Sequence, residues 1–307
     1  EVKLGTFAKS VLLTVALQVL QGNCCLAQCA TTTAFTIVEA LSRPACMLEL
    51  NLRFQDLEQL PTAIGQLSRL RRLHVQDNHL RHLPDEVTRL DSLRELFANK
   101  NGLLDLPAQL GNLHRLRQLQ VNENSLTELP PSIAGLDSLH YLITAWNSFT
   151  SLPDQLGQLK QLEYFDTSHN QLLFLPPSIG KLQNLKYAYL NNNRLQSLPV
   201  QLGELQQLRE LNLADNQLEQ LPTSIGRCHS LKALVLTSNR LKSLPKSLGQ
   251  LADLETLIAS DNQLTALPRS LSKLKKLKTV ILLHNAFTPQ SRRQAEAMLP
   301  GAKLYFE

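Results

Sequence analysis

The sequence predicts an α/β repeat solenoid, in which similar units stack and their short strands form one parallel sheet on the concave side. Two ladders predict this fold, because prolines and asparagines each recur every 23 residues without an insertion. The prolines are Pro61, Pro84, Pro107, Pro130, Pro153, Pro176, Pro199, Pro222, Pro245 and Pro268. The asparagines run from Asn78 through Asn101 and Asn124 to Asn285. Gln55 takes the asparagine position of an earlier, degenerate unit, so we expect 11 units within residues 47–288.

One unit shows the physical basis of the pattern. Residues 70–80 read L-x-x-L-x-L-x-x-N-x-L, and Leu73 and Val75 alternate with polar residues. This alternation is typical of a short strand with one buried face. The amide of Asn78 can both donate and accept, so we expect it to satisfy backbone groups inside the coil. Pro84 has no N–H and a fixed φ, which suits a turn outside the sheet.

The return segment of each unit, such as residues 85–90, is expected to cross the convex side. Glycines recur there, and they predict tight turns or short helical pieces. They are Gly65, Gly111, Gly157, Gly180, Gly203, Gly226 and Gly249. A single unit cannot bury its own leucines, so stacked units must share a continuous core that is covered at both ends.

Residues 28–46 are predicted to form the N-terminal cap. Thr36 and Glu39 have the spacing of a capping box at the start of a helix over residues 37–41, and Pro44 ends that helix.

Residues 289–307 are predicted to form the C-terminal cap. Thr288 and Pro289 can begin a helix that runs to about Leu299, and residues 303–306 are expected to form a final strand.

The N-terminal segment has the zoning of a secretory signal peptide over residues 1–27. Lys3 and Lys9 precede an apolar run from Val11 to Leu20, which is too short to span a membrane. Cleavage after Ala27 would then place the protein outside the cell or on its surface.

Two alternatives stay open for this segment. Leu26–Cys29 resembles a bacterial lipobox, although Gln28 replaces the small residue expected before a lipidated cysteine, so membrane attachment would require lipidation at Cys29. An amphipathic helix packed on the repeats is the other alternative, and it would make the protein cytoplasmic.

Cysteine usage is low, with five cysteines in 307 residues, and does not indicate a disulfide scaffold. Cys29 and Cys46 flank the N-terminal cap and could form a disulfide in an oxidising compartment, with two free thiols as the equal alternative. Cys228 takes a position that is leucine in neighbouring units, so we expect it to be buried.

Composition and motifs point away from catalysis. The sequence contains no glycine-rich phosphate loop, no G-x-S-x-G elbow and no C-x-x-C pair at zinc spacing, so we expect no enzyme activity and no cofactor. The net charge of +5 is too small to indicate a nucleic-acid binder. His74, His79 and His82 fall on different parts of one unit, which favours solvated histidines over a metal site.

The unit L-P-x-x-I-G-x-L-x-x-L-x-x-L-x-V/L-x-x-N-x-L resembles the 23-residue leucine-rich repeats of Ras-group intracellular proteins and of many bacterial and plant relatives. The resemblance extends from Met47 to Phe287, and residues 35–44 and 297–306 resemble the caps of secreted bacterial members. It implies a leucine-rich-repeat horseshoe and a protein-binding scaffold. Some bacterial relatives are effector ubiquitin ligases, but only a short cap is expected after the last repeat here.

Strand positions that do not face the core are predicted to line the concave sheet. In the unit above they are Arg72, His74, Gln76 and Asp77, and steps of 23 residues give their equivalents in the other units. The column of Arg72 places three tyrosines on adjacent strands, about 4.8 Å apart. They are Tyr141, Tyr164 and Tyr187.

Exposed aromatic side chains in one place favour a binding surface, because tyrosine and tryptophan dominate interface hot spots. The predicted partner-binding residues are Phe97, Tyr141, Ile143, Trp146, Tyr164, Asp166, His169, Tyr187 and Tyr189. The alternative is a tyrosine ladder that only stabilises neighbouring strands.

The sequence therefore predicts a secreted or surface-attached bacterial recognition protein that binds a protein partner on its concave face. Carbohydrate or small-ligand binding through the aromatic patch is the second interpretation. An intracellular signalling scaffold of the Ras-group type is the third, and it requires that residues 1–27 are not a signal.

Overall fold

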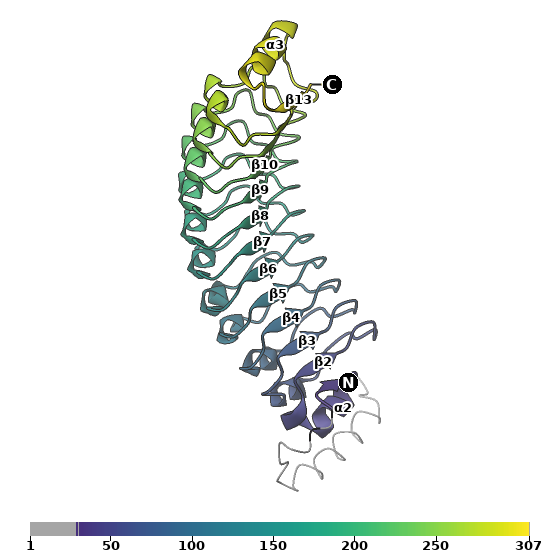
Figure 1. Cartoon of the computed structure of the whole chain (residues 1–307). Helices are drawn as coiled ribbons and strands as arrows, with labels where there is room; N and C mark the ends of the chain where they lie inside the picture. Colours follow the sequence, from purple (N-terminus) through teal and green to yellow (C-terminus); the bar gives the residue numbers. More distant parts are fainter. Residues whose placement is uncertain (1–28, 30, 307) are drawn as a thin grey trace.

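The computed structural model describes residues 29 and 31–306, which form a curved coil of stacked units (Figure 1). Among these residues, 13 strands form a parallel sheet whose spatial order equals the chain order, from β1 to β13. Figure 1 shows the strands along one side of the coil and short helices along the other. The predicted repeat solenoid with one parallel sheet and a cap at each end is confirmed.

Each strand is short. The strands are β1 (Thr33–Ala34), β2 (Glu49–Asn51), β3 (Arg72–His74), β4 (Glu95–Phe97), β5 (Gln118–Gln120), β6 (Tyr141–Ile143), β7 (Tyr164–Asp166), β8 (Tyr187–Tyr189), β9 (Glu210–Asn212), β10 (Ala233–Val235), β11 (Thr256–Ile258), β12 (Thr279–Ile281) and β13 (Lys303–Tyr305). In β2 to β12 the middle residue is buried and its two neighbours point away from the core, except that His74 in β3 is also buried. Within these strands a residue pairs with the one 23 positions later, as Arg72 does with Glu95. Equivalent side chains therefore form straight columns across the sheet.

Short 3₁₀ helices occupy the opposite side. They are η3 (Thr62–Gln66), η4 (Asp85–Arg89), η5 (Leu110–Asn112), η6 (Pro131–Gly135), η7 (Asp154–Gln158), η8 (Pro177–Lys181), η9 (Val200–Glu204), η10 (Thr223–Arg227), η11 (Lys246–Gln250) and η12 (Arg269–Lys273). Most of them follow a proline of the ladder directly, and Pro84 before η4 has an extended backbone (φ −64°, ψ 146°). The predicted helical pieces on the convex side are therefore 3₁₀ turns.

The recurring glycines have a different role from the predicted one. No glycine in the described part of the chain has a positive φ, so turn conformation does not require them. A Cβ atom added to Gly157 would lie 2.4 Å from the carbonyl oxygen of Ser178, and one added to Gly180 would lie 2.4 Å from that of Gln201. Adjacent 3₁₀ helices approach so closely that only glycine fits between them.

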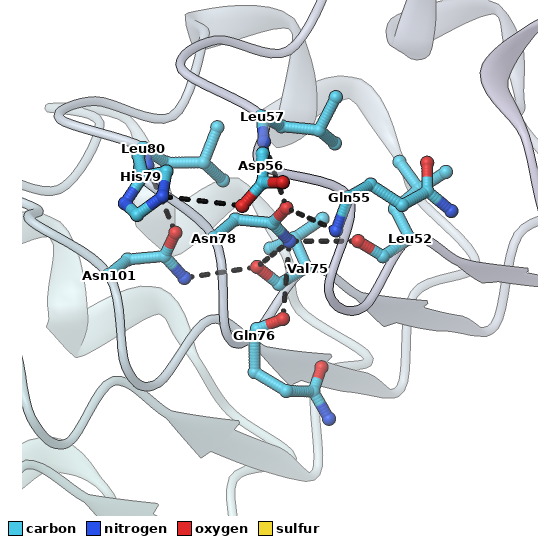
Figure 2. Close-up of polar contacts among 10 residues, drawn as sticks. All are labelled: Leu52, Gln55, Asp56, Leu57, Val75, Gln76, Asn78, His79, Leu80 and Asn101. Carbon is cyan, nitrogen blue, oxygen red and sulfur yellow. Dashed lines mark hydrogen bonds and ion pairs between the residues drawn. The ribbon is translucent and has the colours of Figure 1, made fainter.

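The asparagine ladder ties the units together, as expected from the sequence (Figure 2). The amide nitrogen of Asn78 donates to the carbonyl oxygens of Leu52 (2.8 Å) and Val75 (2.9 Å). Its side-chain oxygen accepts from the backbone N–H groups of Gln55 (3.1 Å) and Leu57 (3.0 Å). One side chain thus satisfies backbone groups of its own turn and of the preceding unit, which are hidden from water.

The N-terminal cap consists of helix α2 (Ile37–Ser42) and the 3₁₀ helix η2 (Pro44–Cys46). The Thr36 hydroxyl accepts from the Glu39 N–H (3.1 Å), while the Glu39 carboxylate accepts from the N–H of Phe35 rather than that of Thr36. The predicted capping box is therefore only half formed.

Cys29 and Cys46 are joined by a disulfide with Cα atoms 5.5 Å apart. Cys228 is buried, which raises the pKa of its thiol to about 12. The predicted signal peptide, residues 1–27, lies outside the described residues. Among the described residues, no helix combines the length and the apolar character needed to cross a membrane.

The C-terminal cap consists of helix α3 (Pro289–Met298) and strand β13. Thr288 and Ser291 form a reciprocal capping box at the start of α3, which the sequence pattern had not indicated. The Phe306 ring lies 5.2 Å from the Phe287 ring, and this contact closes the core at the end of the last repeat.

Candidate binding surface on the concave sheet

Four tyrosines form a continuous group of rings on the concave sheet. Tyr141, Tyr164 and Tyr187 begin β6, β7 and β8 and pair in register. The Tyr164 ring lies 6.2 Å from both Tyr141 and Tyr187, and 5.3 Å from Tyr189. We call Tyr141, Tyr164, Tyr187 and Tyr189 the tyrosine cluster. Its rings stay partly open to solvent, and Tyr141 is 44% exposed.

Trp146 and His169 form a second aromatic group at the far end of β6 and β7. Their rings stack with centroids 3.6 Å apart and planes 8° from parallel, and Trp146 is 56% exposed. We call this pair the Trp–His stack. Trp146 follows β6 by three residues and Tyr141 begins it, so the two aromatic groups lie at opposite ends of the same strands.

The backbone at Trp146 has a left-handed conformation with φ of 57°. The equivalent residue of every unit from Asp77 to His284 has φ between 51° and 57°. Asparagine and aspartate tolerate this region well, and they occupy it at Asn192, Asp215 and Asp261. A bulky tryptophan there costs about 1 kcal/mol or more of backbone strain. Folding alone therefore does not favour Trp146.

The remaining predicted residues divide between these groups and a separate pair. Phe97 stacks on His74 (4.7 Å between centroids, 10° between planes), so it belongs to β3 and β4 rather than to the tyrosine cluster. Ile143 pairs in register with Asp166 and is half-buried. One Asp166 oxygen accepts from the Ser168 N–H (2.9 Å) and hydroxyl (2.7 Å). The single patch predicted from the sequence is thus two aromatic groups with Ile143 and Asp166 between them.

Carboxylates shape the electrostatics of the tyrosine cluster. Burial and the negative charges of Asp166 and Glu210 raise the pKa of Tyr164. Burial raises the pKa of Tyr189, and the charge of Glu210 raises it further. Glu210 was not among the predicted site residues, although it continues the column of Tyr141, Tyr164 and Tyr187 and could have been found there.

The hollows of the molecule lie away from this surface. One of about 520 Å³ lies on the convex side between η7, η8 and η9, and one of about 610 Å³ lies between η12 and α3. The tyrosine cluster is therefore part of an open face, which suits a large partner better than an enclosed small molecule.

The histidines near the N-terminal units pair with carboxylates. The Nδ1 atom of His82 lies 2.9 Å from Asp105, and the Nε2 atom of His79 lies 3.4 Å from Asp56. Within the described residues, no group of three or more histidine, cysteine, aspartate or glutamate side chains is arranged to hold a metal ion.

Two family models match the C-terminal half of the chain. A model described as "Leucine Rich repeats (2 copies)" matches residues 183–226, and one described as "Leucine rich repeat" matches residues 222–287. A search of curated proteins found no match.

Solved structures share the fold over most of the chain. The ectodomain of the plant membrane receptor kinase GASSHO1/SCHENGEN3 from Arabidopsis thaliana, in complex with CASPARIAN STRIP INTEGRITY FACTOR 2, is 29% identical with a TM-score of 0.68. That match covers 86% of this chain and 36% of the receptor chain, so this chain spans about a third of the receptor's length.

Two further structures, each 20% identical, show the fold alone. An internalin from Listeria monocytogenes has a TM-score of 0.65, with 97% of this chain and 94% of that chain covered. A chain in the complex of Latrophilin 3, Unc5D and FLRT2 (LRR) has a TM-score of 0.71, with 85% and 83% covered. The chain is therefore a leucine-rich-repeat solenoid.

Proposed function

We propose that this leucine-rich-repeat solenoid is a non-enzymatic recognition protein that binds a protein partner on its concave face. The binding surface comprises the tyrosine cluster and the Trp–His stack. One observation carries the proposal: exposed aromatic rings gather on adjacent strands of an otherwise mainly polar face, and one of them, Trp146, occupies a position that strains its backbone. Aromatic side chains of this kind supply much of the binding energy at protein interfaces.

The comparisons support binding of a protein in general terms. The Arabidopsis ectodomain was solved in complex with CASPARIAN STRIP INTEGRITY FACTOR 2, and its repeats are 29% identical to this chain. The open shape of the concave face, without an enclosed cavity among the described hollows, also suits a macromolecule.

We further propose that the protein is secreted or displayed at the cell surface, as the resemblance to secreted bacterial members implies. The disulfide between Cys29 and Cys46 fits an oxidising compartment. N-terminal sequencing of the mature protein tests this, because signal cleavage after Ala27 would leave Gln28 as the first residue.

The Tyr164→Ala variant tests the binding surface. Immobilised wild-type protein is used to capture partners from a protein mixture, and the affinity of each captured protein is then measured by surface plasmon resonance. Because Tyr164 contacts three other rings at the centre of the cluster, we expect Tyr164→Ala to weaken binding by about 30-fold or more.

Phe174→Ala is the matched control, since Phe174 is 54% exposed but lies between β7 and η8, outside the concave face. It should leave the affinity unchanged. Equal affinities for Tyr164→Ala and wild type would refute the proposed surface, and capture of glycans in place of proteins would favour the carbohydrate interpretation.

A further inference from the structure

Charge is unevenly distributed on the concave face. Between β5 and β9, the side chains that point away from the core come from three columns, beginning at Gln118, Gln120 and Asn122. These columns contain two charged residues in this region, Asp166 and Glu210, and no lysine or arginine. The centre of the concave face is therefore negative, although the whole chain carries a net charge of +5.

Elsewhere in the described chain, carboxylates near the strands find a cation one unit away. Arg72 pairs with Glu49 (2.6 Å), 23 residues earlier. Lysines do the same, since Lys186 pairs with Glu163 (2.8 Å) and Lys278 with Glu255 (2.6 Å). The equivalent positions in adjacent units are thus the usual source of a counter-charge in this molecule.

Asp166 and Glu210 have no such neighbour. The residues one unit before and after Asp166 are Ile143 and Tyr189, and those beside Glu210 are Tyr187 and Ala233. Among the described residues, neither carboxylate takes part in an ion pair. Both act on the same rings, since both charges raise the pKa of Tyr164 and of Tyr189.

The rings and the carboxylates attract the same kind of group. The face of a tyrosine ring is negative, and a cation placed over it gains more when water is excluded. A carboxylate beside the rings adds a charge-assisted hydrogen bond to an ammonium or guanidinium group. A carboxylate or phosphate of a partner would instead be repelled by both features.

We propose that the tyrosine cluster, with Asp166 and Glu210, receives a cationic side chain, arginine or lysine, from the protein partner. This inference rests on the proposed function and specifies the chemistry of its binding surface. The guanidinium of arginine fits best, because its plane can stack on the Tyr164 or Tyr189 ring while its edge donates to a carboxylate. The incoming charge replaces the counter-charge that other units obtain from their neighbours.

Labelled tetra-arginine and tetra-citrulline peptides test the inference, because citrulline keeps the shape of arginine without its charge. Their affinities for the full chain are measured by fluorescence anisotropy at constant ionic strength. We expect wild type to bind tetra-arginine about tenfold tighter than tetra-citrulline or more. The double variant Asp166→Asn/Glu210→Gln should lose this preference. Its Asp166→Asn change retains a side-chain oxygen that can accept from Ser168, so the local turn is preserved.

The matched control is Glu128→Gln/Glu219→Gln, which removes two exposed carboxylates outside the concave face and should keep the preference for arginine. Thermal melting followed by circular dichroism shows whether each variant is folded. The single variants Asp166→Asn and Glu210→Gln replace the double variant if its melting is altered.

Three outcomes would overturn the inference: equal affinity of wild type for both peptides, no detectable binding of either, or an unchanged preference in the folded carboxylate variants. If Tyr164→Ala still loses the captured protein partner in those cases, the proposed function stands and only the cationic group is wrong. If Tyr164→Ala changes neither peptide nor partner binding, the proposed function fails as well.

Discussion

Replacing Asn170 with alanine is expected to lower the free energy of unfolding by about 3 kcal/mol. The Asn170 amide nitrogen donates to the carbonyl oxygens of Thr144 and Thr167, each at 3.1 Å, and its oxygen accepts from the Phe149 N–H at 3.0 Å. Asn170 and Phe149 are buried, so water cannot replace these bonds in the variant. Each buried polar group left without a partner costs about 1–3 kcal/mol.

Urea unfolding followed by circular dichroism measures the effect. Asn184→Ala is the matched control, because Asn184 also donates to a backbone carbonyl, that of Lys160 at 2.8 Å, but does so at the exposed surface. It should cost less than about 1 kcal/mol. Similar losses for both variants would show that the buried ladder is not a principal source of stability.

Replacing Gly180 with alanine is expected to lower the free energy of unfolding by about 2–3 kcal/mol. The added methyl group would lie 2.4 Å from the carbonyl oxygen of Gln201 and 2.9 Å from its Cβ atom. The first of these atoms is backbone, so η8 and η9 must move apart and the packing between two units is loosened. The same measurement by urea unfolding applies.

Gly102→Ala is the control for this substitution. A Cβ atom at Gly102 would have its nearest neighbour, the Leu80 carbonyl oxygen, at 3.7 Å, which is an ordinary contact. Because the φ of Gly102 is not positive, alanine should be neutral or stabilise by up to about 1 kcal/mol. Gly180→Ala as stable as Gly102→Ala would mean that the convex helices do not need the close approach.

Much of the fold follows from the two ladders in the sequence. The alternation at Leu73 and Val75 correctly predicted a strand at β3, and the 23-residue step correctly predicted which residues pair across the sheet. The reason for the glycines could not be predicted, because it depends on the distance between the backbones of neighbouring units. That distance follows from stacking in three dimensions and has no signature within one unit.

The candidate site was predictable to a lesser degree. The column arithmetic correctly placed Tyr141, Tyr164 and Tyr187 side by side. It did not reveal that Trp146 stacks on His169, because that contact depends on the left-handed backbone that turns both residues at the strand end. Nor did it separate Phe97 from the cluster, since a column position does not determine which neighbour a ring contacts.

The central claim is that the aromatic residues of the concave face serve binding rather than folding, and Trp146→Asn tests it most directly. Asparagine suits the left-handed backbone at this position, so we expect the free energy of unfolding to stay unchanged or to rise by up to about 1 kcal/mol. The affinity for the partner captured by wild type should fall by about tenfold or more. A variant that keeps full affinity but loses about 2 kcal/mol or more of stability would contradict the account, because Trp146 would then be a structural residue.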